Sequence, residues 1–280
     1  MIRGFRWTAW IGLAFATLLA SPAWSQGLCD TFPPGDSDAD GFDDVIECQG
    51  IQLLPGLTFN DASGSASELV PGCPGSELPG EFCMDPNKQT LFVIVVRSSP
   101  SGLPADILSF TSAPEAEGGL GVTVLALSAA DPTGDRTVSA VSTQKAVRIT
   151  ESRDAPGDKL GLANYGSPNG LDGSTIWTAR IEAFVAAQCA GSQCRTDQGA
   201  LGQEAVTDTL ASWVLNHEMG HLLALTATYN SRFGGYHEKA GENEVMTQFV
   251  AYTANRKTGI TTFFIPSTYS DRSRADKLLR

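Results

Sequence analysis

The chain has 280 residues, of which 42% are hydrophobic and 18% are charged. This composition is that of a globular protein with one substantial core, and it excludes the disordered and fibrous classes. The formal net charge of −12 argues against nucleic acid or an anionic membrane as a partner.

Residues 1–25 have the pattern of a signal peptide. Arg3 and Arg6 precede an apolar run over 7–20, and the sequence AWS at 23–25 supplies a small-x-small cleavage site. The run is shorter than the ~20 residues that a membrane span needs, and an uncleaved anchor is the alternative. Cleavage removes two of the 19 basic side chains and none of the 31 acidic ones, which leaves 17 basic groups and a net charge of −14. We expect a secreted, periplasmic or extracellular protein without membrane contact after cleavage.

Residues 26–87 are rich in glycine, proline, serine and acidic side chains, which predicts a loop-rich segment in front of a second domain over 88–280. Within the segment, residues 36–47 read DSDADGFDDVIE. Acidic side chains at loop positions 1, 3, 5, 9 and 12, with glycine at 6, match the EF-hand calcium loop, in which position 7 adds a carbonyl oxygen. The predicted calcium ligands are Asp36, Asp38, Asp40, Phe42, Asp44 and Glu47. A solvated acidic linker is the alternative.

The helix that precedes a full EF-hand loop is replaced here by Pro33, Pro34 and Gly35. The loop therefore resembles the calcium loops of thrombospondin type 3 or dockerin-type repeats. A single loop of this kind implies a structural Ca²⁺ ion rather than a sensor.

All six cysteines follow the cleavage site, in a compartment that permits disulfides. We predict the sequential pairing, because each bridge then closes a short loop: Cys29 with Cys48, Cys73 with Cys83, and Cys189 with Cys194. The sequence has no paired C-x-x-C spacings of the kind that bind zinc. A latent form in which Cys73 blocks a metal is an alternative to its disulfide.

Short apolar runs bounded by turn residues predict strands at 91–96 (LFVIVV), 122–127, 146–150, 160–165 and 176–185. A helix is predicted over 104–117, beginning near Ala105. The strongest helical pattern spans 203–225, where apolar residues share one face with His217 and His221. The predicted fold class is α+β.

The stretch NHEMGH at 216–221 holds two of the three histidines in the chain. Histidines four residues apart on a helix place both imidazoles where they can bind one Zn²⁺ ion, and a buried histidine pair is the alternative. Glu218 would be the general base, since zinc lowers the pKa of its bound water toward ~7 and the carboxylate takes the proton. The third histidine, His237, follows a glycine-containing loop and is the predicted third ligand.

The sequence HEMGH on a helix, followed by a histidine and then Met246, resembles the metzincin clan of zinc endopeptidases, most closely its matrixin-type branch. The resemblance covers roughly residues 90–250 and is specific over 216–247. It implies a mixed twisted sheet and the order strand, helix, strands, active-site helix. It also implies that Met246 forms a methionine turn beneath the zinc.

The chain departs from the metzincin pattern H-E-x-x-H-x-x-G-x-x-H, because Ala224 and Ala227 stand where glycine and histidine are expected. We expect an inserted loop over 226–236 that delays the third ligand to His237. The rival is a gluzincin-like site, in which Glu242 or Glu244 supplies the third ligand.

The leading hypothesis is a secreted, calcium-stabilised zinc endopeptidase that acts on proteins or peptides. A non-catalytic calcium-dependent surface or binding protein with structural zinc is the second hypothesis, and hydrolysis of a non-peptide amide is the third. A structural zinc site needs no general base, so Glu218 favours an enzyme. Tyr229, Tyr236 and Tyr252 are candidates for stabilising the oxyanion, with aromatic packing as the alternative.

Overall fold

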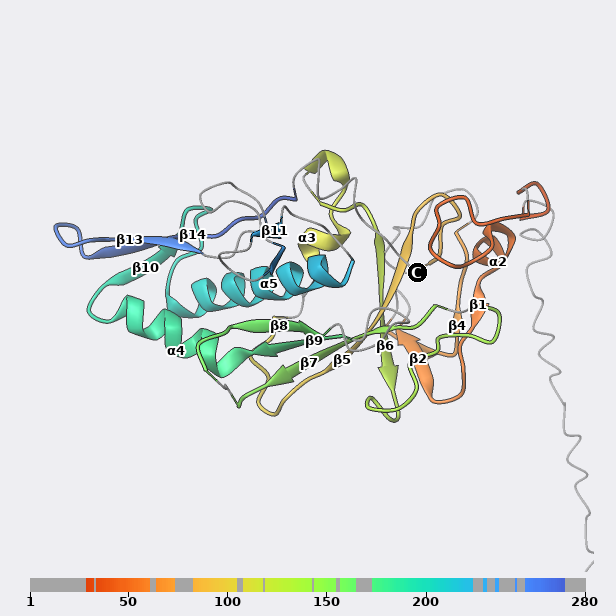
Figure 1. The fold of residues 1–280 in the computed structure, drawn as a ribbon, viewed down its shortest axis with the longest axis horizontal. Coiled ribbons are helices and arrows are strands. Elements are labelled where there is room, and N and C mark those ends of the chain that lie inside the picture. The colour runs from red at the N-terminus through yellow and green to blue at the C-terminus, as the bar shows by residue number, and fades with distance from the viewer. Residues whose placement is uncertain are drawn as a thin grey trace, which may run out of the picture.

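The structure, a computed structural model of the whole chain, has a mixed α+β fold in which strands predominate (Figure 1), and this confirms the predicted fold class. The predicted signal peptide lies outside the described residues. These are residues 29–32, 34–60, 64–73, 83–104, 108–117, 119–142, 144–154, 157–164, 173–223, 229–230, 235–236, 245 and 250–269.

A seven-stranded mixed sheet forms the centre of the fold. Its strands are β2 (Leu57–Asn60), β3 (Ala66–Ser67), β5 (Thr90–Val96), β6 (Thr123–Ala129), β7 (Val147–Ser152), β8 (Gly161–Asn164) and β9 (Gly173–Trp177). Their spatial order is β3-β2-β6-β5-β7-β9-β8. The four central strands are parallel, whereas β2, β3 and β8 run antiparallel to their neighbours. Strands β2 and β3 come from the segment 26–87, so that segment contributes to the same sheet.

Strand β5 lies at the middle of the sheet and is buried on both faces. A central parallel strand selects consecutive apolar residues, which is why the run LFVIVV folds here. Leu91 and Val93 belong to one hydrophobic core, and Phe92 and Ile94 belong to the other. The sheet therefore separates two cores.

Helices α3 (Ser109–Ser112), α4 (Thr178–Cys189) and α5 (Gln203–Leu222) lie on one face of the sheet (Figure 1). The first core fills the space between them and the strands. Val206, Leu210 and Val214 of α5 pack there with Ile149 and Ile176 of the sheet. Helix α5 is thus packed against the strands through these residues, and from Trp213 to Gly220 it is buried on all sides.

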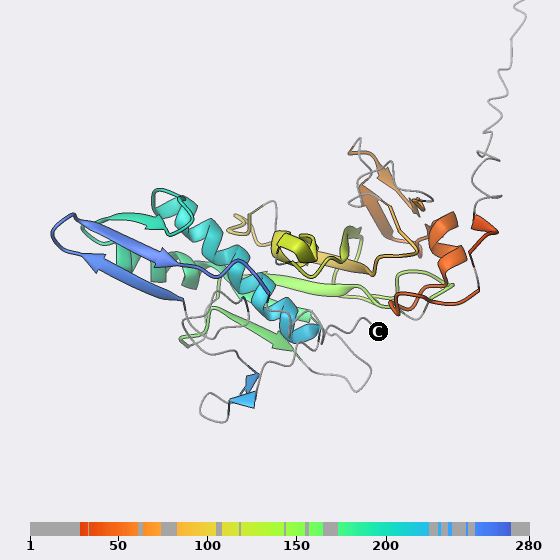
Figure 2. The same cartoon turned by 90° about the horizontal axis from the view of Figure 1, so that it is seen from above.

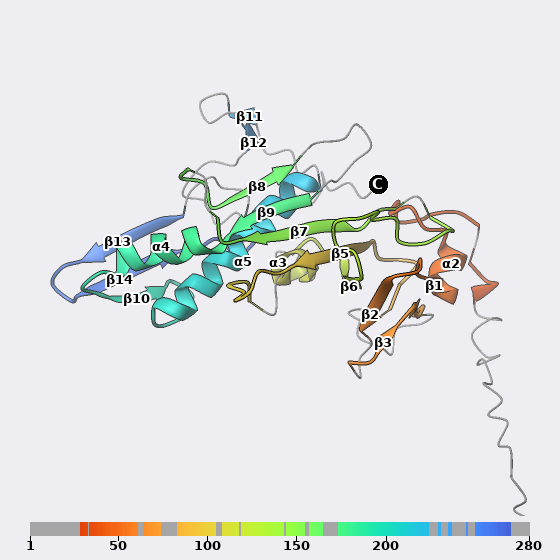
Figure 3. The same ribbon diagram turned by 90° about the horizontal axis from the view of Figure 1, so that it is seen from below.

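The second core is closed by the N-terminal part of the chain. This part contains helix α2 (Asp44–Gln49) and the antiparallel pair β1 (Ile51–Gln52) and β4 (Leu69–Val70). The rings of Phe42 and Phe92 lie 5.7 Å apart in this core. Figure 3 shows α2, β1 and β2 gathered at one end of the molecule.

A three-stranded sheet stands at the opposite end (Figure 2). It consists of β10 (Gln193–Thr196), β14 (Ile260–Phe264) and β13 (Ala251–Asn255), in that order. Phe184 of α4 packs against Tyr252 and Phe263 of this sheet, with ring centroids 6.1 and 6.3 Å away. A separate short hairpin pairs β11 (Tyr229–Asn230) with β12 (Gly235–Tyr236).

The predicted strands at 91–96, 122–127, 146–150 and 160–165 correspond to β5, β6, β7 and β8, although Tyr165 lies outside the described residues. The strand predicted over 176–185 is wrong, because β9 ends at Trp177 and α4 begins at Thr178. Ile181, Val185 and Cys189 of α4 are buried at a spacing of four residues, which is the helical period and not the alternation of a strand.

The helix predicted over 104–117 is shorter than expected. Among the described residues of this stretch, α3 spans four residues, and a 3-10 turn, η1, covers Glu115–Glu117. Pro114 separates the two pieces, and proline cannot continue a regular helix. The prediction of one continuous helix did not take into account that Pro114 interrupts it.

The predicted disulfide pairing is confirmed: Cys29–Cys48, Cys73–Cys83 and Cys189–Cys194, with Cα atoms 5.4 to 5.6 Å apart. Cys73 is therefore not a free thiol that could block a metal. The bridges are compatible with an extracellular protein. Within the described part of the chain, no helix combines the length and the apolar character that a membrane span requires.

A buried carboxylate at the end of β7 organises the neighbouring loop. Glu151 accepts hydrogen bonds from the hydroxyls of Ser101 and Thr178 and from the backbone N–H groups of Ser98 and Gly102. Burial alone would raise the pKa of this carboxyl, but the four hydrogen bonds, led by that of Ser101, lower it to about 2. The charged form of Glu151 thus joins β7, the 98–102 loop and the start of α4.

We expect Glu151→Gln to lower the free energy of unfolding at neutral pH by roughly 3 kcal/mol, because each pKa unit corresponds to about 1.4 kcal/mol. The folded-state pKa lies below the ordinary value of 4.5. The stabilisation is therefore complete above about pH 5 and is lost as the pH falls toward 2. Urea unfolding over this range should show the difference between the two proteins shrinking with falling pH. Glu117→Gln, which changes an exposed carboxyl, should match the wild type throughout.

Candidate metal centres

The second half of α5 carries polar side chains in a buried position. Asn216 is fully buried, and His217 and Glu218 are only 6% and 8% exposed. The helix is held between the sheet and its neighbours, since it packs against α3, α4, β8 and β9. Three adjacent polar residues at such a place need partners, because an unpaired buried polar group is costly.

The imidazole of His217 has a defined orientation. Its Nδ1 lies 2.8 Å from the carbonyl oxygen of Val245. A carbonyl oxygen only accepts hydrogen bonds, so Nδ1 carries the proton and Nε2 keeps its lone pair. A backbone acceptor of this kind fixes the tautomer and the ring plane of a metal-binding histidine.

The two histidines converge on one point. Nε2 of His221 lies 3.1 Å from Nε2 of His217, and the two rings are nearly perpendicular, at 88°. Two tetrahedral ligands at ~2.0–2.1 Å from a zinc ion are about 3.3 Å apart, so the pair fits such an ion with a small adjustment. Without a metal, an Nε2–H of His221 can donate to His217 at the same distance.

Glu218 lies under the edge strand β8. Burial raises the pKa of its carboxyl to about 7, and the Ala163 N–H and the charge of Lys159 oppose this rise. Strand β8 approaches the helix at Gly161, where an added Cβ would lie 2.9 Å from Glu218 Cγ and 2.7 Å from Val214 Cγ1. Only glycine permits this contact, which keeps Glu218 beside the strand.

A polar network behind the helix fixes its position. Asn216 Oδ1 accepts hydrogen bonds from the backbone N–H of Thr111 (2.9 Å) and from its hydroxyl (2.7 Å). The hydroxyl of Tyr269 donates to the carbonyl oxygen of Asn216 at 2.7 Å. All three residues are buried. Sequence analysis missed this network, although a polar Asn216 on an apolar helix face was a signal that it had a buried partner.

The C-terminal segment also reaches His217 through Val245. The N–H of Val245 donates to the carbonyl of Thr268 (2.8 Å), and the carbonyl of Val245 accepts from His217. The predicted third ligand His237, its rivals Glu242 and Glu244, and the predicted turn residue Met246 lie outside the described residues. Val245 is described, and the chain at this point passes beside the histidine pair.

The three tyrosines considered for stabilising the oxyanion lie in two different sheets. Tyr252 is 42% exposed and packs with Phe184 and Phe263 in the three-stranded sheet, as the packing alternative proposed. The backbones of Tyr229 and Tyr236 pair with one another in the β11–β12 hairpin. Their side chains lie outside what the structure describes.

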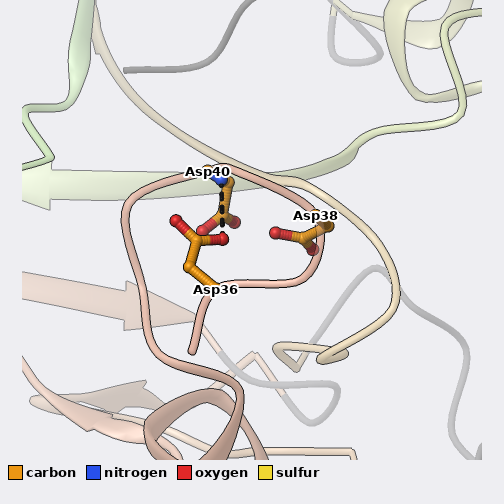
Figure 4. Close-up of side chains that lie close together, drawn as sticks. All are labelled: Asp36, Asp38 and Asp40. Atoms are coloured by element: carbon orange, nitrogen blue, oxygen red, sulfur yellow. Dashed lines mark hydrogen bonds between the residues drawn. The ribbon is translucent and has the colours of Figure 1, made fainter. Parts of the chain in front are cut away.

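Three of the predicted calcium ligands form a compact cluster. Figure 4 shows the carboxylates of Asp36, Asp38 and Asp40 turned toward one another inside the loop, and one oxygen of each lies within 4.8 Å of the others. Asp36 accepts hydrogen bonds from the N–H groups of Asp40 and Gly41. Gly41 has φ 97°, the conformation that glycine permits at loop position 6.

The remaining predicted ligands surround this cluster. Glu47, on α2, is fully buried, and neither carboxylate oxygen has a hydrogen-bond partner among the described residues. Asp44 accepts hydrogen bonds from the N–H and hydroxyl of Ser37. Phe42 donates its N–H to Asp40 and buries its ring against Phe92. Glu47 is thus the group that most needs a cation.

The electrostatics of the loop agree with this reading. Burial, and then the charges of Asp40 and Asp38, raise the pKa of Glu47 to about 10. Burial and the charge of Asp40 raise the pKa of Asp38 to about 8. Burial also raises the pKa of Asp40 to about 6, against the hydrogen bonds from Thr90 and Phe42. Carboxylates crowded together in this way are unfavourable until a positive charge joins them.

Comparisons of the chain with models of protein families, with curated proteins and with solved structures found no match. The interpretation of both centres therefore rests on the side chains and distances described above.

We expect Asn216→Leu to lower the free energy of unfolding by roughly 3 kcal/mol. The substitution removes the oxygen that accepts hydrogen bonds from both the buried backbone N–H and the hydroxyl of Thr111. Urea unfolding at neutral pH measures the change. Thr209→Ala is a matched control, since it removes a hydroxyl that bonds the Ala205 carbonyl within the same helix, and it should cost below about 1 kcal/mol. Equal costs for the two variants would contradict the role given to Asn216.

Proposed function

We propose that this chain is a secreted, zinc-dependent endopeptidase with a metzincin-like fold, which hydrolyses peptide bonds in proteins or peptides. The observation that carries the proposal is the convergence of the two Nε2 atoms of His217 and His221, 3.1 Å apart. The Val245 carbonyl leaves Nε2 of His217 unprotonated and therefore able to bind a cation. The three disulfides support the secreted location.

The residues of the centre have separate roles. Bound zinc would act as a Lewis acid and acidify water. Glu218 is the general base: it takes a proton as the water oxygen attacks the carbonyl carbon, and it returns the proton to the leaving amine as the C–N bond breaks. The Ala163 N–H and the close packing at Gly161 hold its carboxyl in place.

The edge strand β8 supports a polypeptide as the substrate. It pairs with β9 on one side and forms the end of the seven-stranded sheet. An edge strand offers backbone donors and acceptors to an extended peptide, which joins the sheet as a further strand. Since β8 also contacts Glu218, a peptide bound there would have its backbone near the general base. A small non-peptide amide would not use this edge.

The order of elements supports the metzincin resemblance. The chain runs through β5, α3, the strands β6 to β9, and then α5 with the histidine pair, which is the order that the resemblance implies. Helix α4 and strand β10 stand between β9 and α5 as additional elements. The metzincin-like reading of residues 90–250 is part of this proposal.

The alternative proposals differ in the third ligand or in the role of the metal. In the metzincin-like version His237 is the third ligand and Met246 forms the turn beneath the zinc, whereas in a gluzincin-like version Glu242 binds the metal. In a non-catalytic binding protein with structural zinc, a buried carboxylate beside the first histidine has no purpose. The burial of Glu218 favours the enzyme.

We also propose that the loop 36–47 binds a structural Ca²⁺ ion. The observation in favour is Glu47, which is fully buried and accepts no hydrogen bond from the described residues. Asp36, Asp38 and Asp40 would contribute carboxylate oxygens, Phe42 its carbonyl oxygen, and Asp44 the ninth loop position, directly or through water. Oxygen ligands at this spacing suit calcium better than zinc.

We expect Glu218→Gln to keep its zinc and to lose between about 10²- and 10⁴-fold of the peptidase activity, because the variant cannot accept the proton. Metal content by mass spectrometry and hydrolysis of casein measure the two properties. Glu204→Gln, at the exposed start of the same helix, should retain both. A wild type without zinc would contradict the proposal, and so would a fully active Glu218→Gln.

A second experiment identifies the third zinc ligand. We expect His237→Ala to lose its zinc, while Glu242→Ala and Glu244→Ala retain about one ion per chain, because three protein ligands are needed to hold a catalytic zinc ion tightly. The zinc content after dialysis measures the difference. Retained zinc in His237→Ala, together with its loss in Glu242→Ala, would replace the metzincin-like version with the gluzincin-like one.

A further inference from the structure

Asp40 connects the calcium loop to the central strand of the sheet. One carboxylate oxygen accepts a hydrogen bond from the N–H of Phe42, within the loop. The other accepts the backbone N–H of Thr90, at 2.6 Å. Thr90 is the first residue of β5. A predicted calcium ligand thus also caps the strand on which both cores depend.

Two glutamines and a serine make further connections between the loop and the body of the protein. Gln144 Nε2 donates to the carbonyl of Asp40 (2.7 Å) and to that of Thr90 (2.9 Å). Gln89 Nε2 donates to the carbonyl of Asp38, and Ser142 Oγ donates to the carbonyl of Gly41. The loop backbone is therefore fixed on two sides, by the start of β5 and by the turn before β7.

Phe42 belongs to the calcium loop, and its side chain is part of the second core. Its side chain is 1% exposed and packs against Phe92 of β5. The face of the sheet beneath it is formed by Phe92, Ile94, Leu125 and Leu127. Phe42, Ile51 and Leu53 pack on this face from outside the sheet, and their removal would expose its apolar side chains to water. The segment is a structural layer of the sheet and not a separable attachment.

The same loop concentrates negative charge around the fully buried Glu47. Without a cation, the closed loop must either keep these carboxylates charged against one another or protonate them, and because both are costly an open loop is favoured, which displaces Asp40 and Phe42 together. We propose that calcium locks residues 34–54 onto the sheet as a permanent second layer of the active protein, so that loss of the ion loosens β5 and β6 and not the loop alone. This inference rests on the calcium site proposed above and is independent of the zinc centre.

The test compares the full mature chain after EGTA treatment with the same protein in excess calcium. Calorimetry measures calcium binding, thermal unfolding measures stability, and hydrogen exchange with mass spectrometry follows residues 90–96 and 123–129. We expect calcium at about a hundred times its Kd to raise the Tm by roughly 5–10 °C. We also expect it to slow exchange in β5 and β6 as well as in the loop. Because EGTA also chelates zinc, both samples receive the same excess of Zn²⁺ after the chelator is removed, and their zinc contents should then be equal.

Variants separate binding of the ion from its structural effect. Glu47→Gln should abolish the calcium-dependent Tm shift, whereas Glu68→Gln, which alters an exposed carboxyl in the same segment, should keep it. Gln144→Met retains every predicted ligand and the direct Asp40–Thr90 hydrogen bond, but removes the two hydrogen bonds by which Gln144 links the carbonyls of Asp40 and Thr90. It should still bind calcium, while exchange in β5 responds less to the ion. Phe42→Leu tests the same point through the apolar contact if Gln144→Met does not fold.

The outcomes are distinct. Absence of calcium binding overturns both the calcium site and this inference, and leaves the zinc centre unaffected. Calcium binding with protection confined to residues 36–47 overturns the inference alone. A mature, active protein that begins after residue 60 also overturns it, because the second layer would then be dispensable.

Discussion

The burial of β5 on both faces is the constraint on which the rest of the structure depends. A parallel strand at the centre of a sheet is stable only when both faces are covered. The helices α3, α4 and α5 cover the face of Leu91 and Val93, and the N-terminal segment covers the face of Phe92 and Ile94. Each covering layer carries one candidate metal centre, so the two centres lie on opposite sides of the same sheet. The sheet is their common support.

Both candidate centres bury polar side chains, but they differ in the hydrogen-bond partners that the protein provides for them. The histidine pair can satisfy itself without a metal, because the carbonyl of Val245 binds one ring nitrogen and the two Nε2 atoms are within hydrogen-bond distance. The acidic loop lacks such internal hydrogen bonds at Glu47, because neither carboxylate oxygen has a hydrogen-bond partner among the described residues. The histidine pair is therefore held in place by the protein itself, whereas the acidic loop leaves the buried Glu47 without a hydrogen-bond partner among the described residues.

The sequence predicted those features whose determinants are local. The clustering of Asp36, Asp38 and Asp40 followed from their spacing within one short loop, and β5 followed from its six consecutive apolar residues. Helix α4 was misread because Ile181 and Val185 belong to a short apolar run that suits either structure until burial is known. The Asn216 network could not be predicted, since its partners lie 105 residues before it and 53 residues after it. Nothing in a single sequence gives the register of such distant contacts.

The same distances show that the histidine pair of α5 depends on distant parts of the chain for its position. Tyr269 and Thr268 come from the last described segment of the chain, and they hold Asn216 directly and His217 through Val245. The N-terminal segment holds the opposite face of the sheet through Phe42. The position of Asn216 and His217 is therefore set by Thr111, far before the helix, and by the last described segment after it. Such contacts have high sequence separation, and their loop-closure entropy must be overcome before they stabilise anything. In the N-terminal part, the bridges Cys29–Cys48 and Cys73–Cys83 restrict the unfolded chain over 19 and 10 residues, which lowers the entropy lost there on folding.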